Sequence, residues 1–134
     1  QDPPARRRTH AMKLLIVDDS LVIRNRIQRI ASGRRFSTLY TAANGRQAIE
    51  LFKRERPDVV TMDITMPEVD GIAATTEMVR STPKALILIV SAVADKPTAI
   101  EALKRGAHGF LLKPFTDQQL ADALAVLING AGHG

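Results

Sequence analysis

The sequence predicts an α/β domain in which helices cover both faces of a parallel sheet. Short apolar runs, such as residues 14–17, 59–62 and 86–90, alternate with segments whose apolar residues recur at helical spacing. The runs are near-continuously apolar, as expected for strands that are buried on both faces. A length of 134 residues fits one domain of this class.

Strands and helices are expected to alternate regularly along the chain, five of each. We expect strands at residues 13–18, 36–42, 59–62, 86–90 and 109–112. We expect one helix after each strand, around residues 23–31, 48–52, 72–80, 97–103 and 117–128. The first helix illustrates the evidence, because Ile23, Ile27, Ile30 and Ala31 repeat at the spacing of a core-facing stripe.

Capping and turn residues set the expected limits of these helices. Ser20 is placed to cap the first helix, and Asn44-Gly45 indicates a turn before the second. Pro57 ends the second helix, and Pro97 fits the first turn of the fourth. The glycines at 130, 132 and 134 predict a frayed end over residues 130–134.

Composition and charge narrow the function class. The chain has no cysteine, which excludes disulfides, thiolate metal sites and a cysteine nucleophile and is compatible with the cytoplasm. The net charge is +5, and Arg6, Arg7 and Arg8 lie in a segment without apolar pattern. We expect residues 1–11 to form a disordered basic tail or an upstream extension, and residues 12–129 to form the folded domain. No run is long enough to span a bilayer.

Polar residues follow four of the strands, and they should meet at one edge of the sheet. Asp18 and Asp19 follow the first strand, Asp63 the third, Ser91 the fourth and Lys113 the fifth. In parallel sheets, ligands bind outside the carboxyl ends of the strands. The sequence therefore predicts that three carboxylates, a hydroxyl and an amine converge there.

The three carboxylates predict a divalent-cation site. Mg²⁺ prefers hard oxygen ligands, with Mn²⁺ as an alternative, and clustered acids without a cation repel one another. Asp63 is the candidate nucleophile, since a carboxylate can attack a phosphoryl group when positive charge offsets the charge on the transferring oxygens. Taken alone, Asp18-Asp19 would equally fit a helix cap, and Asp63 would fit a solvated strand end.

The remaining candidates also have ordinary interpretations. Lys113 can pair with a phosphate as a point charge, or it can be a surface lysine. Ser91 can donate its hydroxyl to a phosphate oxygen, or it can serve turn chemistry. Phe110 is by default a buried strand aromatic.

These motifs together resemble the receiver domains of two-component response regulators. The resemblance covers about residues 13–129 and rests on residues 16–20 (IVDDS), 62–71 (MDITMPEVDG), 90–92 (VSA) and 109–115 (GFLLKPF). The stretch from Asp63 to Gly71 is the most specific of them. The family implies a flavodoxin-like (βα)5 three-layer sandwich with strand order 2-1-3-4-5.

The resemblance also implies a role for each residue. Asp63 would accept a phosphoryl group from the phosphohistidine of a histidine kinase, with Mg²⁺ as the cofactor. Asp19, Asp63 and the backbone carbonyl of Thr65 would bind the metal directly, and Asp18 mainly through water. Ser91 and Lys113 would hold the phosphoryl oxygens, and the peptide bond between Lys113 and Pro114 would be cis.

Activation would couple Ser91 to Phe110 and change the surface formed by the fourth helix, the fifth strand and the fifth helix. A downstream protein would bind this surface. We expect a cytoplasmic monomer that binds neither nucleic acid nor membrane, and that catalyses only its own phosphorylation and dephosphorylation. Within the family the chain looks most like single-domain chemotaxis regulators, and the alternative is a receiver domain excised from a longer regulator.

This chain departs from common family patterns at several positions. Ser91 stands where the family often has Thr, and Phe110 lacks the ring hydroxyl of the Tyr frequent in chemotaxis members. Thr65 and Val93 occupy positions that tune phosphoryl lifetime, and neither supplies an acid or amide side chain.

Three other function classes fit the sequence less well. A haloacid dehalogenase-type phosphatase would need an Asp two residues after its nucleophile, where this chain has Thr65. A nucleotide-binding module would need a glycine-rich loop after the first strand, where Asp18-Asp19-Ser20 stands. A non-phosphorylated scaffold would be expected to lose some of the site residues.

Overall fold

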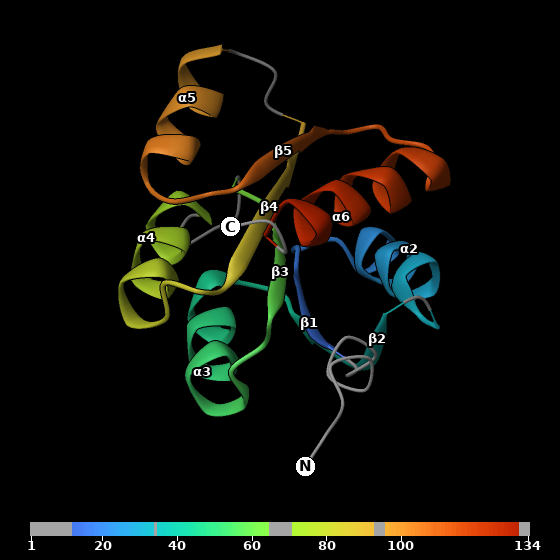
Figure 1. Ribbon diagram of the computed structural model, residues 1–134, viewed down its shortest axis with the longest axis horizontal. Helices are drawn as coiled ribbons and strands as arrows, with labels where there is room; N and C mark the ends of the chain where they lie inside the picture. The colour runs from blue at the N-terminus through green and yellow to red at the C-terminus, as the bar shows by residue number, and fades with distance from the viewer. Residues whose placement is uncertain (1–11, 34, 65–70, 93–95, 132–134) are drawn as a thin grey trace.

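The computed structural model describes residues 12–33, 35–64, 71–92 and 96–131. Its five strands form one parallel sheet in the order β2-β1-β3-β4-β5, and Figure 1 shows helices on both sides of this sheet. The strands are β1 (Met12–Val17), β2 (Phe36–Ala42), β3 (Val59–Met62), β4 (Leu86–Ser91) and β5 (Gly109–Leu112). The helices are α2 (Leu21–Ala31), α3 (Gly45–Glu55), α4 (Gly71–Ser81), α5 (Lys96–Lys104) and α6 (Asp117–Ala131).

This topology confirms the predicted flavodoxin-like three-layer sandwich. The chain leaves β1 toward β2 on one side and returns to β3 on the other, so β1 and β3 are neighbours whose connections run in opposite directions. Such a point, where the strand order reverses, opens a crevice at the carboxyl ends of the two strands. Asp18-Asp19 and Asp63 follow the two strands that border this crevice.

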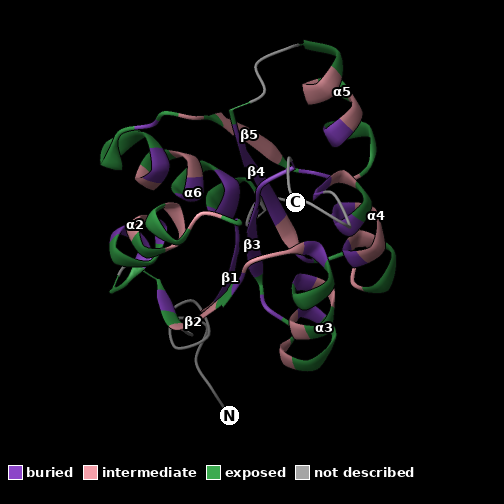
Figure 2. Cartoon of the chain, turned by 180° about the vertical axis from the view of Figure 1, so that it is seen from behind, coloured by how far each residue is buried: buried purple, intermediate pink, exposed green. Residues whose placement is uncertain are grey.

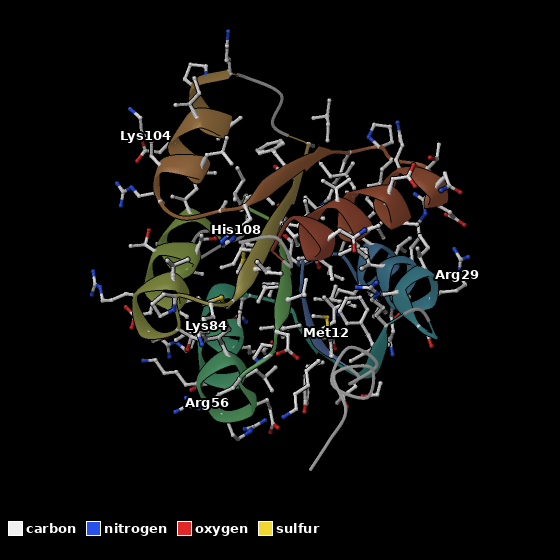
Figure 3. All side chains as sticks on the ribbon, viewed as in Figure 1. Met12, Arg29, Arg56, Lys84, Lys104 and His108 are labelled. Carbon is white, nitrogen blue, oxygen red and sulfur yellow. The ribbon has the colours of Figure 1, made fainter. Side chains whose placement is uncertain are left out.

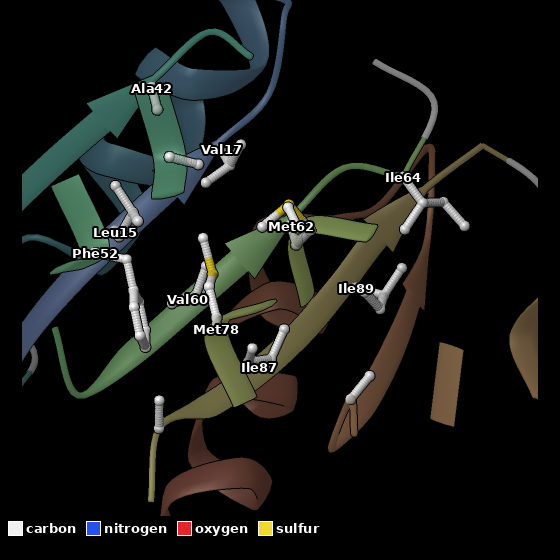
Figure 4. Packing of buried hydrophobic residues seen from close by; sticks show 14 of the residues in the cluster. Leu15, Val17, Ala42, Phe52, Val60, Met62, Ile64, Met78, Ile87 and Ile89 are labelled. Carbon is white, nitrogen blue, oxygen red and sulfur yellow. The ribbon is translucent and has the colours of Figure 1, made fainter. Parts of the chain in front are cut away.

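Two hydrophobic clusters, one on each face of the sheet, hold the layers together. The first cluster joins the sheet to α3, α4 and α5 through buried residues such as Phe52, Met78 and Ala102, and Figure 4 shows its packing. The second cluster joins the other face to α2 and α6, through residues such as Ile27 and Leu120. Figure 2 shows the central strands buried and the outer faces of the helices exposed.

Alternation along the strands explains the two clusters. On β1, Leu15 and Val17 belong to the first cluster, and Leu14 and Ile16 to the second. Successive side chains of a strand point to opposite faces, so a strand that is covered on both faces must be apolar throughout. Many charged side chains are exposed, among them Arg29, Arg56, Lys84 and Lys104, which Figure 3 labels.

The predicted helix limits hold at most positions. Ser20 caps α2, because its Oγ accepts the backbone N–H of Ile23 at 3.3 Å. Before Pro57, Arg56 ends α3 in the left-handed conformation at φ 51°. Within the described residues, no helix is long and apolar enough to cross a bilayer.

Two helix ends differ in detail from the prediction. The turn predicted at Asn44-Gly45 is the start of α3 itself, because Asn44 caps the helix by accepting the N–H of Gln47 at 2.9 Å and Gly45 is the first helical residue. Gly130 is part of α6, which continues to Ala131, beyond the helix end expected near residue 128. The favourable backbone hydrogen bonds of a long helix outweigh the poor helix propensity of one glycine. The predicted tail, residues 1–11, lies outside the described residues.

Candidate functional site

Three carboxylates converge at the carboxyl edge of the sheet, as the sequence predicts. One oxygen each from Asp18, Asp19 and Asp63 lies within 4.8 Å of the other two. Backbone hydrogen bonds extend the sheet past the strand ends and fix this arrangement, since the N–H of Asp63 donates to the carbonyl of Val17 at 3.0 Å. Asp18 and Asp63 are buried, and Asp19 is exposed.

Lys113 brings a positive charge to this cluster. Its Nζ lies 2.7 Å from Oδ2 of Asp18 and 3.7 Å from Oδ2 of Asp63, and its side chain is only 18% exposed. The backbone N–H of Lys113 donates to the carbonyl of Ser91 at 2.9 Å, which ties the end of β5 to the end of β4. The interpretation of Lys113 as an ordinary surface lysine is therefore wrong. The bond between Lys113 and Pro114 is cis, as the family resemblance implied.

Both carboxylate oxygens of Asp18 accept hydrogen bonds from the protein. Oδ1 accepts the backbone N–H of Ser20 at 2.9 Å, and Oδ2 accepts from Lys113. Burial raises the pKa of Asp18 above its usual value, and the hydrogen bonds from Lys113 and Ser20 oppose this shift. The raised pKa means that burial of the charged carboxylate is not fully compensated by its protein partners alone.

The donor set fits a hard divalent cation. Carboxylate oxygens are the ligands that Mg²⁺ and Mn²⁺ prefer, and a cation would relieve the repulsion among three acids held this close together. A cation held by the three carboxylates, together with the Lys113 ammonium 3.7 Å from Asp63, would offset the negative charge of an incoming phosphoryl group. Thr65, whose carbonyl the family resemblance assigns to the metal, lies outside the described residues, as does Val93.

The two expected switch residues lie on neighbouring strands. Ser91 ends β4 and is fully buried. Phe110 pairs with Ile89 across β4 and β5 and packs against the first cluster. Phe110 is half-buried rather than buried, because β5 is the edge strand of the sheet. It also borders a groove of about 270 Å³ between β5 and α6 that includes His108 and Val126.

Two further residues support the site and were not assigned by sequence reasoning. A Cβ built on Gly71 would lie 2.5 Å from the Cα of Ile64 and 2.7 Å from the carbonyl carbon of Asp63, so only glycine lets α4 approach the candidate nucleophile this closely. Arg24 donates from Nη1 to the backbone carbonyl of Asp18 at 2.7 Å. The position of Gly71 in the Asp63–Gly71 motif was the available signal for the first residue. The sequence carries no comparable signal for Arg24.

Comparisons with known proteins agree with this geometry. Residues 14–125 match the model of the response regulator receiver domain. The chain is 41% identical over 112 residues to the chemotaxis protein CheY of Thermotoga maritima, covering 84% of this chain and 93% of that protein. It is 42% identical over 109 residues to a protein-glutamate methylesterase/protein-glutamine glutaminase of Vibrio vulnificus, covering 80% of this chain but 29% of that protein.

A solved structure from Borrelia burgdorferi, described as a CheX–CheY–BeF3–Mg²⁺ complex, superposes with a TM-score of 0.83 at 28% identity. The match covers 87% of this chain and 89% of that one. The family match spans most of the chain and includes every strand end that carries a site residue. The chain therefore belongs to the receiver domain family of two-component response regulators.

Proposed function

We propose that this protein is a phosphoacceptor response regulator that takes a phosphoryl group from a histidine kinase onto Asp63 in the presence of Mg²⁺. It then signals by phosphorylation-dependent protein binding of the chemotaxis type. One observation carries the proposal: three carboxylate oxygens lie within 4.8 Å of one another, and the Lys113 ammonium lies 2.7 Å from Asp18 and 3.7 Å from Asp63. The arrangement brings a candidate nucleophile, a cluster of carboxylates and the Lys113 ammonium together at one edge of the sheet.

In the proposed transfer, an oxygen of Asp63 attacks the phosphorus of the phosphohistidine. The P–N bond breaks, and the imidazole nitrogen leaves with the bonding electrons and takes up a proton. Lys113 and the Ser91 hydroxyl would hold oxygens of the transferred group. Bound Mg²⁺ would neutralise charge on those oxygens.

Asp19, Asp63 and the Thr65 carbonyl are the proposed direct metal ligands, and Asp18 is proposed to act through water. Both carboxylate oxygens of Asp18 already accept hydrogen bonds from the protein, which supports contact with the metal through water. Beyond its own phosphorylation and dephosphorylation, we propose no enzymatic activity. We propose that the chain acts as a cytoplasmic monomer and binds no nucleic acid.

Phosphorylation by a small phosphodonor tests the proposal directly. With acetyl phosphate and Mg²⁺, intact mass measurement should detect one added phosphoryl group on the wild-type protein and none on Asp63→Asn. Hydroxylamine should release the label, because acyl phosphates are labile to it. An acid-stable label on the variant would sink the assignment of Asp63, and a retained base-labile label would assign the chemistry to another carboxylate.

We propose that the output passes through Ser91 and Phe110 to the surface formed by α5, β5 and α6. The Ser91 carbonyl already contacts the Lys113 backbone, and Phe110 lies on the strand that Lys113 follows. Drawing the Ser91 hydroxyl toward a phosphoryl group would make room for the Phe110 ring to turn. A partner that prefers this arrangement shifts the equilibrium only by its differential affinity.

Beryllofluoride, a phosphoryl mimic, tests this route when it is added together with Mg²⁺. Amide resonances from Ser91 to Leu112 should shift, beyond those next to the acidic cluster. Phe110→Ala should weaken partner binding more than phosphorylation. Shifts confined to Asp18, Asp19, Asp63 and their neighbours would refute the route.

A receiver that belongs to a longer regulator is the second candidate. The match to a methylesterase, of which this chain covers 29%, favours it, because the same domain there forms part of a larger protein. An antibody against the domain, used on an extract of the native cells, distinguishes the two candidates by the size of the protein that it detects.

A further inference from the structure

The N-terminal end of helix α2 is hydrogen-bonded to Asp18, which precedes the helix. The backbone N–H of Ser20 donates to Oδ1 of Asp18 at 2.9 Å, and Arg24 donates to the Asp18 carbonyl at 2.7 Å. One end of this helix is therefore fixed to the acidic cluster.

The same helix grips the loop that follows Lys113, through the side chain of Arg26. Nη2 of Arg26 donates to the carbonyl of Phe115 at 2.6 Å and to Oδ1 of Asp117 at 3.2 Å. The guanidinium carbon lies 4.7 Å from the centroid of the Phe115 ring, which is a cation–π contact. These contacts join α2 to a segment about 90 residues away in the chain. Arg26 contacts the backbone and the ring of Phe115 and the carboxylate of Asp117.

The gripped segment begins two residues after Lys113. Phe115 is 3% exposed and belongs to the second cluster, so its ring lies between the core and the Arg26 guanidinium. A lysine side chain is a flexible four-carbon stem, and the position of its backbone decides where its ammonium can reach. Whatever fixes the backbone from Lys113 to Phe115 therefore also limits the distance from the ammonium to Asp18 and Asp63.

We infer that Arg26 is a positioning residue for phosphoryl transfer: its contacts with Phe115 and Asp117 keep Lys113 at its place beside the acidic cluster. The inference rests on the proposed function, because it concerns the group that would hold the phosphoryl oxygens. A guanidinium stays charged at all relevant pH values, so Arg26 keeps its donors and its charge beside Phe115.

The contacts distinguish this role from that of an ordinary surface ion pair. Exposed ion pairs contribute little to stability, and the Asp117 carboxylate is 56% exposed. The shortest contact of Arg26 is instead with a backbone carbonyl of the loop, and its side chain is 31% exposed. Arg29 offers a natural comparison, since it also faces Asp117, at 3.7 Å, with a side chain that is 66% exposed.

The test compares Arg26→Met with Arg29→Met in the full chain. Methionine keeps an unbranched apolar stem against Phe115 but removes the donors and the charge. Because misplacement of a reacting group by about 1 Å can cost roughly 100-fold in rate, a partial loss of position should lower the phosphorylation rate by roughly tenfold. The rate is measured with acetyl phosphate at saturating Mg²⁺. Arg29→Met should stay within about twofold of the wild type, since exposed pairs contribute little.

A split between two readouts excludes a merely structural role. Arg26→Met should leave Mg²⁺ affinity unchanged, because the metal carboxylates do not touch Arg26. Arg26→Lys, which keeps the charge but loses the fork of donors, should recover only part of the rate. Should Arg26→Met not fold, judged by far-ultraviolet circular dichroism, Arg26→Gln replaces it.

A double-mutant cycle then asks whether Arg26 acts through Lys113, with beryllofluoride affinity in the presence of Mg²⁺ as the readout. In a Lys113→Met background, Arg26→Met should have no further effect. An equal loss in both backgrounds, or an unchanged affinity and rate in the single variant, would overturn the inference. Failure of the wild type to be labelled on Asp63 would instead overturn the proposed function.

Discussion

Replacing Lys113 by methionine should destabilise the metal-free protein, and Mg²⁺ should reverse part of the loss. The Lys113 ammonium is 2.7 Å from Asp18 and 3.7 Å from Asp63, and these two residues are only 1% and 2% exposed. Methionine has a similar length but no charge, so the substitution leaves two buried carboxylates without their neighbouring cation. Asp18 loses a hydrogen bond as well.

The expected cost follows from the burial of the pair. Removing one partner of a fully buried ion pair typically costs about 3–5 kcal/mol. Lys113 is 18% exposed, and water therefore screens the pair to some extent. Asp18 also keeps the N–H of Ser20. Both features lower the expected cost, so we expect the free energy of unfolding to fall by about 2–4 kcal/mol at neutral pH in the presence of EDTA.

Urea unfolding followed by circular dichroism at a helix wavelength measures this quantity, since the chain has no tryptophan. The experiment is run in EDTA and again in excess MgCl2. A ligand that binds only the folded state stabilises it by about 2.7 kcal/mol at 100 times its dissociation constant. Mg²⁺ should reduce the difference in the free energy of unfolding between Lys113→Met and the wild type, because the metal supplies the missing positive charge. Lys84→Met, at an exposed position before β4, is the matched control.

The reasoning fails if Lys113→Met changes the free energy of unfolding in EDTA no more than Lys84→Met does. It also fails if the gap between Lys113→Met and the wild type stays the same with and without Mg²⁺. Either outcome would mean that the carboxylates do not depend on the ammonium for compensation.

Three further predictions concern single side chains. Asp19→Ala should weaken Mg²⁺ binding by at least the roughly tenfold loss of affinity that is typical when outer-shell groups are removed. The substitution should not destabilise the metal-free protein, because it relieves repulsion among the three carboxylates. An unchanged affinity in a magnesium titration would reject Asp19 as a ligand. The Nδ1 of His108 accepts the backbone N–H of Ile87 at 3.1 Å, and desolvation lowers the pKa of His108 below 6.5. The neutral imidazole therefore stabilises the folded protein above pH 6.5, and this stabilisation is lost as the pH falls below 6.5. Urea unfolding between pH 7.5 and 5.5 should show this loss as a fall in the free energy of unfolding with falling pH. His108→Asn should reduce the slope of that free energy against pH, and equal slopes for the variant and the wild type would show that His108 does not cause the loss. Thr61 is fully buried between Ile16 and Leu88 with an unpaired hydroxyl among the described residues, so Thr61→Val should raise the free energy of unfolding by about 1–2 kcal/mol, and a decrease would show that the hydroxyl has a partner.

The sequence determined the succession of strands and helices and the residues at the strand ends. Hydrophobic periodicity is a local property, and β3, for example, was predicted with the bounds Val59–Met62 that the structure has. The general preference of parallel sheets for ligand sites at their carboxyl edge then placed Asp18, Asp63 and Lys113 together. Local patterns located helix ends less closely, since the turn predicted at Asn44-Gly45 is the capped start of α3 and α6 continues through Gly130.

Only the tertiary structure decided how the site residues pair. The sequence could not tell that Lys113 lies closer to Asp18 than to Asp63, or that Gly71 must lack a side chain because α4 lies against the Asp63 backbone. The grip of Arg26 on Phe115 was equally hidden, since nothing near either residue marks a contact across about 90 positions of the chain. The physical reason is that periodicity fixes which face of an element is buried. The distance between two side chains on different elements depends instead on how the helices and the sheet pack.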